Sequence, residues 1–234
     1  MNIAKPAEGE AALLSFDEVE TMFHEFGHAL HGFFASQHYP SLSGTAVSRD
    51  FVEFPSQFNE NWTLFPEVLN NYALHYKTGA KIPQELITKI KNAGSFNQGY
   101  SLIEVLAASN LDILWHTISN DTKISDVNSF ENEALKSVNL LMKEVPTRYR
   151  STYFAHIFSG GYYAGYYSYL WTEVLSHDTF DYFLENGGLT RENGQRYRDM
   201  ILSRGNTLEL EKMYVDFRVS APKIEPMIKA KGIN

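Results

Sequence analysis

Apolar side chains recur at helical spacing in the first part of the chain. The stripe consists of Val19, Met22, Phe23, Phe26, Ala29, Leu30 and Phe33. Positions three and four apart share one face of a helix, so this stripe predicts a helix that buries one side. Ser15 suits the N-cap, and Glu18 three residues later completes the sequence of a capping box. The pattern therefore predicts a helix from Ser15 through Phe33.

Helical periodicity continues through the rest of the chain. A second helix is expected from Ser48 or Asp50 to about His75, either continuous or broken at Pro66. Further helices are expected at 83–93, 96–118, 126–142, from near Tyr162 onward, at 190–202 and from 206 or 207 to 218, with Pro222 and Pro226 ending the order. We predict an all-α fold in a single domain, residues 1–234, with at most a short β-hairpin or strand near the N-terminus.

The first helix carries the residues His24-Glu25-Phe26-Gly27-His28. Side chains at i and i+4 lie about 5–6 Å apart, so both imidazoles can reach one zinc ion at roughly 2.0–2.1 Å. Glu25 lies about 100° around the helix from His24 and is suited to accept a proton from a zinc-bound water. The alternative is chance, because the motif fixes only three residues. Gly27 lowers helix propensity, which indicates a close approach by another group.

Zinc held by two protein ligands needs a third, and Glu53 is the candidate. It stands early in the second predicted helix, which would run antiparallel to the first. The alternative is that Glu53 only completes a capping box with Asp50. Asp50 and Gln57, each about one turn from Glu53, are candidates for orienting the ligands. His31, one turn beyond His28, is expected to lie beside the metal site or to line a channel.

A second chemical stretch runs from Tyr153 to Trp171 and contains the Gly160-Gly161 pair, which indicates a hinge. In a helix that begins near Tyr162, the side chains of Tyr162, Tyr166 and Tyr169 would share one face. A hydrolase that attacks a peptide carbonyl must stabilise the oxyanion, and phenols or imidazoles can donate the hydrogen bonds. The alternative is that these small and aromatic residues only allow helices to pack closely.

Segments 24–32, 43–45 and 49–57 together resemble the thimet oligopeptidase-like zinc peptidases. The resemblance extends from Lys5 to Asn234, and within the family it is greatest to the bacterial peptidyl-dipeptidases. Ala46 and Ser48 stand where the family has Asn and Pro, in a loop outside the predicted metal site.

The resemblance implies a role for each matching residue. It implies one zinc ion as cofactor, bound by His24, His28 and Glu53, with Glu25 activating the water. It also implies that the segment after residue 152 binds substrate and stabilises the transition state. These roles fall on His156, Tyr162 and Tyr169, and less strongly on Tyr166.

Family members are several hundred residues long and carry the zinc helix in their C-terminal part. Their active site lies in a channel between two mainly helical halves. We therefore expect this chain to be the C-terminal catalytic portion of a longer enzyme, whose N-terminal portion forms the other channel wall. The expected reaction is release of C-terminal dipeptides from oligopeptides. The alternatives are internal cleavage of oligopeptides and, for the isolated chain, a zinc-binding helical module without turnover.

Composition and charge limit the expected partners, the metal-ligand types and the location of the protein. The formal net charge is −8 and no basic stripe is present, so nucleic acid is not an expected partner. No apolar run approaches the length of a membrane span, and the first fifteen residues do not have the pattern of a signal peptide. There are no cysteines, which excludes disulfides and thiolate ligands. We expect a cytoplasmic protein.

Overall fold

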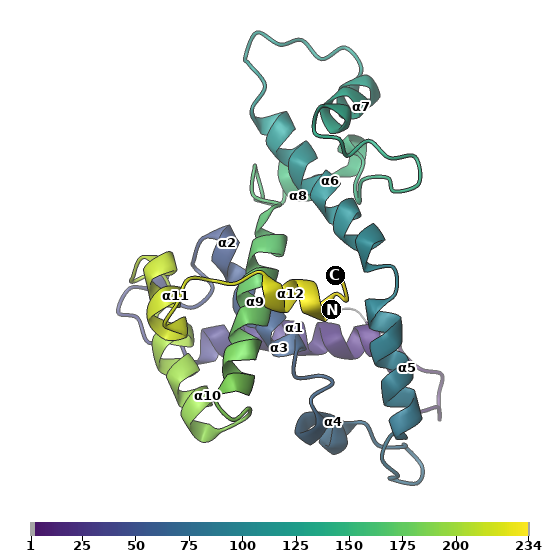
Figure 1. The fold of residues 1–234 in the computed structure, drawn as a ribbon, viewed down its shortest axis with the longest axis vertical. Helices are drawn as coiled ribbons and strands as arrows, with labels where there is room; N and C mark the ends of the chain where they lie inside the picture. The colour runs from purple at the N-terminus through teal and green to yellow at the C-terminus, as the bar shows by residue number, and fades with distance from the viewer. Residues whose placement is uncertain (1–2, 234) are drawn as a thin grey trace.

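The computed structural model describes residues 3–233 (Figure 1). Its first helix, α1 (Phe16–Phe33), agrees with the predicted boundaries. The capping box is complete, because the Ser15 hydroxyl accepts the Glu18 N–H at 3.2 Å and the Glu18 carboxylate accepts the Ser15 N–H at 2.7 Å. Local sequence therefore determines where this helix begins.

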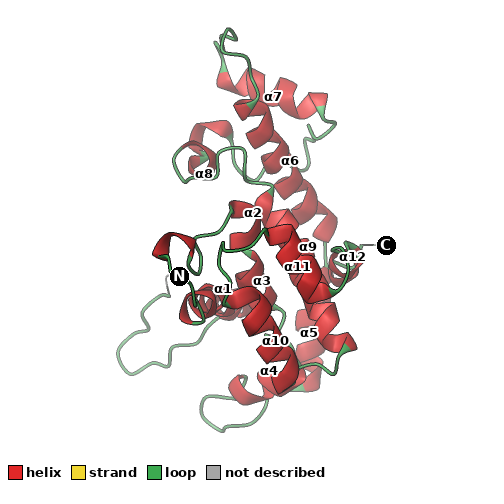
Figure 2. Cartoon of the chain, turned by 90° about the vertical axis from the view of Figure 1, so that its left-hand side faces the viewer, coloured by secondary structure: helices red, strands yellow, loops and turns green. Residues whose placement is uncertain are grey.

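Helices make up the regular structure of the described residues, and no strand is present among them (Figure 2). The helices after α1 are α2 (Arg49–Val52), α3 (Phe54–Glu60), α4 (Pro66–Tyr72), α5 (Gln84–Ser95), α6 (Gln98–His116), α7 (Val127–Ser137), α8 (Ala155–Phe158), α9 (Ser168–Glu185), α10 (Arg191–Tyr197), α11 (Leu210–Arg218) and α12 (Glu225–Ala230). Short 3₁₀ turns lie at Pro40–Leu42 and Ser151–Tyr153, and a π-helical turn, Arg198–Leu202, continues α10. An isolated antiparallel bridge joins Leu74 to Lys81. The predicted all-α class is confirmed.

The main core lies where α3 packs between α1 and α9. The buried residues of this core are Phe51, Phe54, Phe58, Trp62, Leu175, Phe183, Tyr197, Ile201, Leu202, Met213, Tyr214 and Phe217. Many of the aromatic rings meet edge to face, the arrangement that ring quadrupoles favour. Helices α10 and α11 complete this core, so α3 and its neighbours are held rigidly.

Helices α6, α7 and α8 form an arm that projects from the main core (Figure 1). Its own smaller clusters join α6 to α7 through Ala107 and Leu111, and α6 to α8 through Ala108 and Ile157. The chain returns from this arm to the main core along α9. The arm therefore fixes the segment that precedes α9.

Several predicted boundaries are wrong for identifiable reasons. The second helix is not continuous to His75, and the alternative break at Pro66 is the one observed. Phe65 is extended (φ −71°, ψ 128°), as the residue before a proline must often be. The helix expected from Tyr162 begins instead at Ser168, after a run of turns. Order also continues past Pro226, which occupies the first turn of α12, where proline is tolerated.

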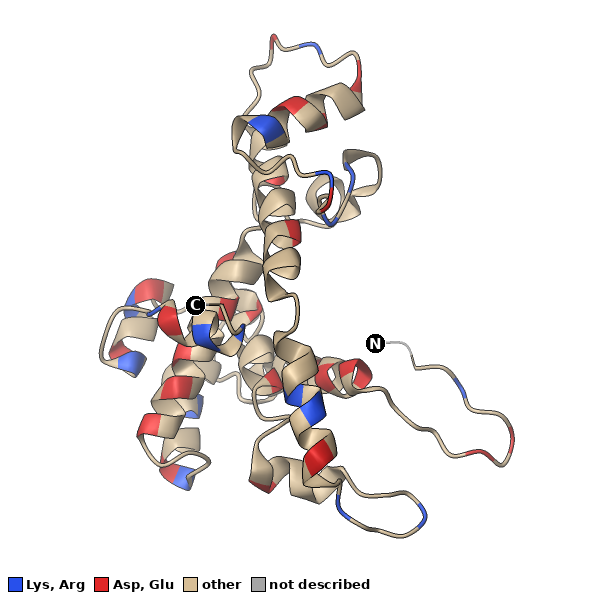
Figure 3. Ribbon diagram, turned by 45° about the vertical axis from the view of Figure 1, so that its right-hand side comes forward, with Lys and Arg blue, Asp and Glu red and all other residues tan. Residues whose placement is uncertain are grey.

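Charged residues are spread over many helices and loops rather than gathered on one element (Figure 3). Within residues 3–233, no helix is long and apolar enough to cross a membrane.

Candidate metal centre and the tyrosine segment

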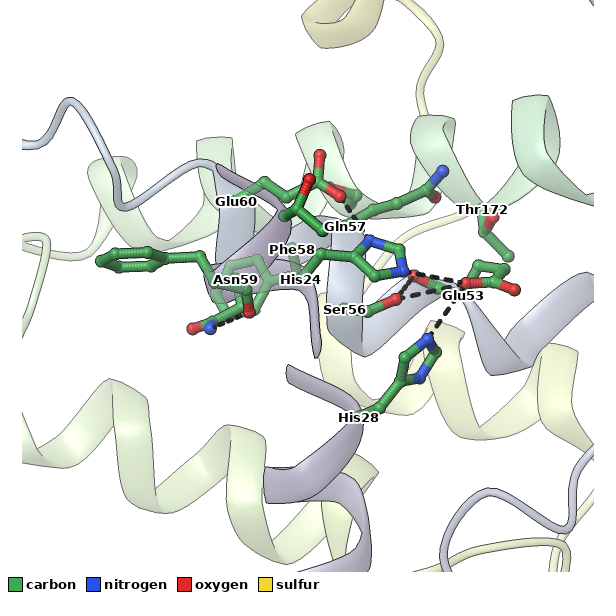
Figure 4. Close-up of polar contacts among 12 residues, drawn as sticks. His24, His28, Glu53, Ser56, Gln57, Phe58, Asn59, Glu60 and Thr172 are labelled. Atoms are coloured by element: carbon green, nitrogen blue, oxygen red, sulfur yellow. Dashed lines mark hydrogen bonds and ion pairs between the residues drawn. The ribbon is translucent and has the colours of Figure 1, made fainter. Parts of the chain in front are cut away.

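The side chains of His24, His28 and Glu53 converge between α1 and the junction of α2 with α3 (Figure 4). Glu53 Oε2 lies 3.4 Å from His24 Nε2 and 3.2 Å from His28 Nε2. One ligand atom from each residue falls within 4.8 Å of the others. The structure thus brings together the residues that the sequence predicts as metal ligands.

Gly27 permits this convergence. A Cβ atom at residue 27 would lie 2.5 Å from Ser56 Cα and 2.7 Å from the Pro55 carbonyl oxygen. The bare backbone of α1 therefore touches the backbone of α3 one turn after Glu53. Asn59 fixes the same crossing, since its Nδ2 donates to the Phe23 carbonyl at 2.6 Å. The close approach expected at Gly27 is observed.

The chemistry of the cluster fits a zinc ion. Two imidazoles and one carboxylate form a ligand set typical of catalytic zinc, which leaves a coordination position open. Burial tends to raise the pKa of Glu53, but hydrogen bonds from His24, His28 and Tyr162 outweigh it and hold that pKa well below its usual range. Burial tends to lower the pKa of His24, yet hydrogen bonds with Glu53 and Glu60 raise it to about 9. The site is therefore an anionic pocket that attracts a cation, either a proton or a metal.

Glu60 is part of this site although the sequence reasoning did not identify it. Its Oε1 lies 2.5 Å from His24 Nδ1, so the carboxylate holds the ring by the nitrogen that faces away from Glu53 (Figure 4). Such carboxylate–histidine pairs fix ring orientation and tautomer in metal sites. The available signal was position, because Glu53 and Glu60 are seven residues apart, which is two turns of a helix.

Two further residues of α1 that the sequence indicates, Glu25 and His31, differ in burial. The Glu25 side chain is exposed, and it borders an open apolar groove of about 1080 Å³ that none of the three candidate ligands lines. His31 is fully buried, so of its two expected positions the channel wall is wrong, whereas its interaction with His28 agrees with a place beside the candidate ligands. Burial and the neighbouring His28 lower its pKa to about 4, and His31 is neutral at physiological pH.

Segment 159–167, which we call the tyrosine segment, brings phenols to the metal centre. The Tyr162 hydroxyl donates to Glu53 Oε1 at 2.5 Å. The Tyr162 and Tyr169 rings stack with centroids 5.2 Å apart and an angle of 18° between planes. Tyr169 in turn hydrogen-bonds Tyr162, which makes a chain of hydroxyls ending at Glu53. The His156 ring lies 6.1 Å from that of Tyr162.

Burial raises the pKa values of both Tyr162 and Tyr169, and the nearby Glu53 carboxylate raises them further. These phenols consequently keep their protons at physiological pH and act as hydrogen-bond donors. Tyr166 is buried against Phe154 in the arm, with centroids 4.9 Å apart, and its ring also lies 5.2 Å from that of Tyr169 and 5.8 Å from that of His156. Its role at the site stays a prediction.

The residues expected to orient the metal ligands have other partners. Asp50 accepts hydrogen bonds from the Ser48 hydroxyl at 2.6 Å and from the Tyr167 hydroxyl at 2.9 Å. Gln57 donates from Nε2 to the Tyr169 carbonyl at 3.2 Å. Both residues therefore tie the helices that carry the metal ligands to the tyrosine segment and α9.

A helix with two histidines around a glutamate, packed against a second helix with a carboxylate, defines the class of helical HExxH proteins. Comparison of the sequence with known families gives the more specific assignment. The chain belongs to peptidase family M3, whose profile matches residues 1–233.

Individual relatives agree with this family. The chain is 54% identical over 233 residues to the dipeptidyl carboxypeptidase of Escherichia coli, covering 100% of this chain and 34% of that protein. It is 38% identical over 236 residues to oligopeptidase A of the same organism, covering 99% of this chain and 34% of that protein. Saccharolysin of Saccharomyces cerevisiae is 31% identical over 233 residues, covering 99% of this chain and 33% of that protein. The chain thus spans about a third of the length of these curated relatives.

Proposed function

We propose that the chain is the catalytic portion of a zinc metallopeptidase that releases C-terminal dipeptides from oligopeptides. One observation carries the proposal: a two-histidine, one-carboxylate cluster whose carboxylate also accepts a hydrogen bond from Tyr162. A metal ligand set and a phenol are thereby adjacent, and the phenol can stabilise an oxyanion when its single proton turns from Glu53 to the substrate. The similarity to dipeptidyl carboxypeptidases supports dipeptide release.

In this proposal His24, His28 and Glu53 hold the ion, and Glu60 orients His24. A bound zinc would polarise the scissile carbonyl and acidify a water molecule. Glu25 accepts the proton of the attacking water and later gives it to the departing amine. Its side chain is exposed and so is accessible to substrate.

Tyr162, Tyr169 and His156 would bind the peptide and stabilise the tetrahedral oxyanion. Their position next to Glu53 and the raised pKa values of the two phenols support donation of hydrogen bonds at neutral pH. Each such donor is worth roughly 10²–10³ in kcat when it is aimed at the developing charge.

A second candidate is cleavage within oligopeptides, which the similarity to oligopeptidase A favours. We further propose that sequence corresponding to the rest of the relatives' length supplies the other wall of the substrate channel. Without that wall, the chain would be a zinc-binding helical module with little or no turnover. A cytoplasmic location stays a prediction.

The test pairs the chain with its Glu25→Gln variant. Bound zinc is measured in each, and a short blocked peptide is assayed by mass spectrometry. We expect about one zinc in both proteins and dipeptide products only from the parent. Products cut internally would instead support the second candidate.

The two remaining outcomes separate the site from its activity. Zinc in both proteins without hydrolysis would support the module alone, and a longer chain would then be assayed. A folded protein that binds no zinc contradicts the metal site.

A further inference from the structure

The backbone of the tyrosine segment adopts an unfavourable conformation, which requires stabilising contacts. Residues 162–167 form successive turns rather than a helix, and Ala164 has φ of 53°. A left-handed conformation at a residue other than glycine is energetically unfavourable and persists only where the surroundings hold it. Tyr162 and Tyr169 flank this strained position, so their placement depends on whatever stabilises it.

Asp112 of α6 provides the stabilising contacts. Its side chain is fully buried, and its Oδ1 accepts the Ala164 N–H at 3.0 Å while Oδ2 accepts the Tyr166 N–H at 2.8 Å. His116, one turn later, places Nδ1 2.9 Å from Oδ1. A buried carboxylate with both oxygens bound to one turn is an uncommon and costly arrangement, which indicates a specific purpose.

The opposite side of the tyrosine segment rests on α2 and on Glu53. Arg49 lies over the Tyr162 ring, 4.8 Å from its centroid, and Asp50 accepts the Tyr167 hydroxyl. These contacts are made to the side chains of Tyr162 and Tyr167, whereas Asp112 accepts hydrogen bonds from the backbone between those two residues. The segment is therefore clamped between the arm and the metal centre.

We propose that Asp112 is a positioning residue, which fixes the turn at residues 164–166 so that the Tyr162 hydroxyl stays on Glu53 and Tyr169 stays stacked on Tyr162. The inference rests on the proposed function for its kinetic consequence. Asp112 touches neither the metal ligands nor a substrate, and it acts only through the tyrosines. His116 assists by occupying the Oδ1 atom.

The first test measures anchoring without activity or metal. Amide hydrogen exchange at Ala164 and Tyr166 is followed by NMR in the parent and in Asp112→Asn, which keeps the shape but presents N–H₂ where one acceptor stood. Exchange at both amides is expected to be about 10- to 100-fold faster. Unchanged exchange at both would overturn the proposal.

Asp178→Asn is the matched control. Asp178 is also fully buried and accepts hydrogen bonds from Tyr214 at 2.8 Å and Arg218 at 3.0 Å, in contact with α11 rather than the tyrosine segment. It should lower global stability yet leave the Ala164 and Tyr166 amides at parent rates under native conditions. Equal acceleration by both variants would mean general loosening and would contradict a specific anchor.

The second test measures whether Asp112 changes kcat through the positions of Tyr162 and Tyr169. Asp112→Asn should lower kcat by about 10- to 100-fold with KM changed less than about threefold, because misplaced donors mainly lose transition-state contacts. In a Tyr169→Phe background the same substitution should lower kcat by less than about threefold. An equal loss in both backgrounds would show that Asp112 acts elsewhere.

Loss of activity in the parent chain and misfolding of the Asp112→Asn variant are each treated separately. A parent chain that binds zinc but does not hydrolyse peptides supports the helical module without turnover, and the exchange measurement then decides the role of Asp112 by itself. If Asp112→Asn fails to fold, His116→Ala replaces it, since that ring is partly exposed and its Nδ1 contacts Asp112 at Oδ1 (2.9 Å) and at the carbonyl oxygen (2.8 Å). It should accelerate exchange at Ala164 by a smaller factor, and no acceleration would overturn the proposal.

Discussion

At the scale of single residues, Glu53 receives contacts from α1, from its own helix and from the tyrosine segment. His24, His28, Ser56 and Tyr162 all approach its carboxylate, and only 6% of the residue is exposed. Glu60 is more exposed and contacts His24 alone among the candidate ligands. The two glutamates should therefore affect metal binding to different degrees.

Glu60→Gln tests the orienting contact. The amide cannot hold the His24 imidazole as strongly as a carboxylate does, so we expect zinc affinity to fall about 10- to 100-fold with the fold retained. Competition with a chromophoric chelator measures the affinity, and circular dichroism checks the helices. Glu67→Gln, an exposed change on α4, is the control. Equal affinity in all three proteins would remove Glu60 from the site.

Glu20 makes stability depend on pH. Burial, Glu60 and Asp17 raise its pKa from 4.5 to about 7. The folded state therefore binds more protons than the unfolded state between these values, and stability is lost as pH rises through this window. Glu20→Gln should make the metal-free chain about 1–2 kcal/mol more stable at about pH 8 and change little below about pH 4.5. Urea unfolding at both pH values measures this, and a gain at the lower pH alone would contradict it.

At the scale of elements, the crossing of α1 and α3 determines whether the candidate ligands meet. Gly27 lies at the contact, whereas Gly32 in the same helix has open space around its Cβ position. The two glycines form a natural pair of test positions, because they share a helix and differ in packing.

Gly27→Ala should destabilise the chain by about 1–3 kcal/mol, since the new methyl group meets the α3 backbone. Gly32→Ala should stabilise it by up to about 1 kcal/mol through helix propensity. Thermal unfolding of both variants measures the difference, and zinc affinity should fall only for Gly27→Ala. Similar unfolding temperatures for the two variants would contradict the close contact.

The elements show which parts of the structure could be predicted from sequence. Helix α1 has a capping box and a stripe of its own, so local information was sufficient. The tyrosine segment misled the prediction because an alanine, not a glycine, takes the left-handed position at 164. Its conformation depends on Asp112, 52 residues earlier in the sequence, and no local pattern records that contact.

The residues of the candidate site likewise differ in whether the sequence alone could identify them. His24, His28 and Glu53 could be identified because metal chemistry constrains residue type and spacing together. Glu60 was missed because its seven-residue spacing from Glu53 indicates a partner for the metal ligands only once α1 is packed against α3. The roles of Glu25, His156, Tyr162 and Tyr169 stay proposals that the assays above address.

At the scale of the whole molecule, the chain exposes more surface than its size requires. Its accessible area is 14041 Å², whereas a compact protein of 26.7 kDa exposes about 10,700 Å². The molecule has an arm that projects from the main core (Figure 1) and an open apolar groove beside α1. Phe26 and Met22 line that groove with 54% and 43% of their surface exposed. Such a face is suited to be covered by other protein.

The isolated chain should therefore bind the dye anilinonaphthalene sulfonate while folded. Phe26→Ser should lower the dye fluorescence by about half or more, because it removes an apolar side chain from the groove. Phe96→Ser is the control, since Phe96 is 80% exposed and lies outside the groove. Titrations are made on metal-free protein at matched helicity. Equal losses from the two variants would mean that the dye binds elsewhere.

The contact between Tyr162 and Glu53 also implies an order of assembly. The three candidate ligands come from residues 24–53, whereas the Tyr162 hydroxyl reaches Glu53 across 109 residues. Contacts between near neighbours in sequence form sooner than distant ones, because less chain must be ordered to close them. During refolding, the ion would be captured before the phenols arrive. A chain truncated before Tyr162 would thus bind its metal ion without the phenols, so metal binding and the Tyr162 contact would form at separate times during refolding.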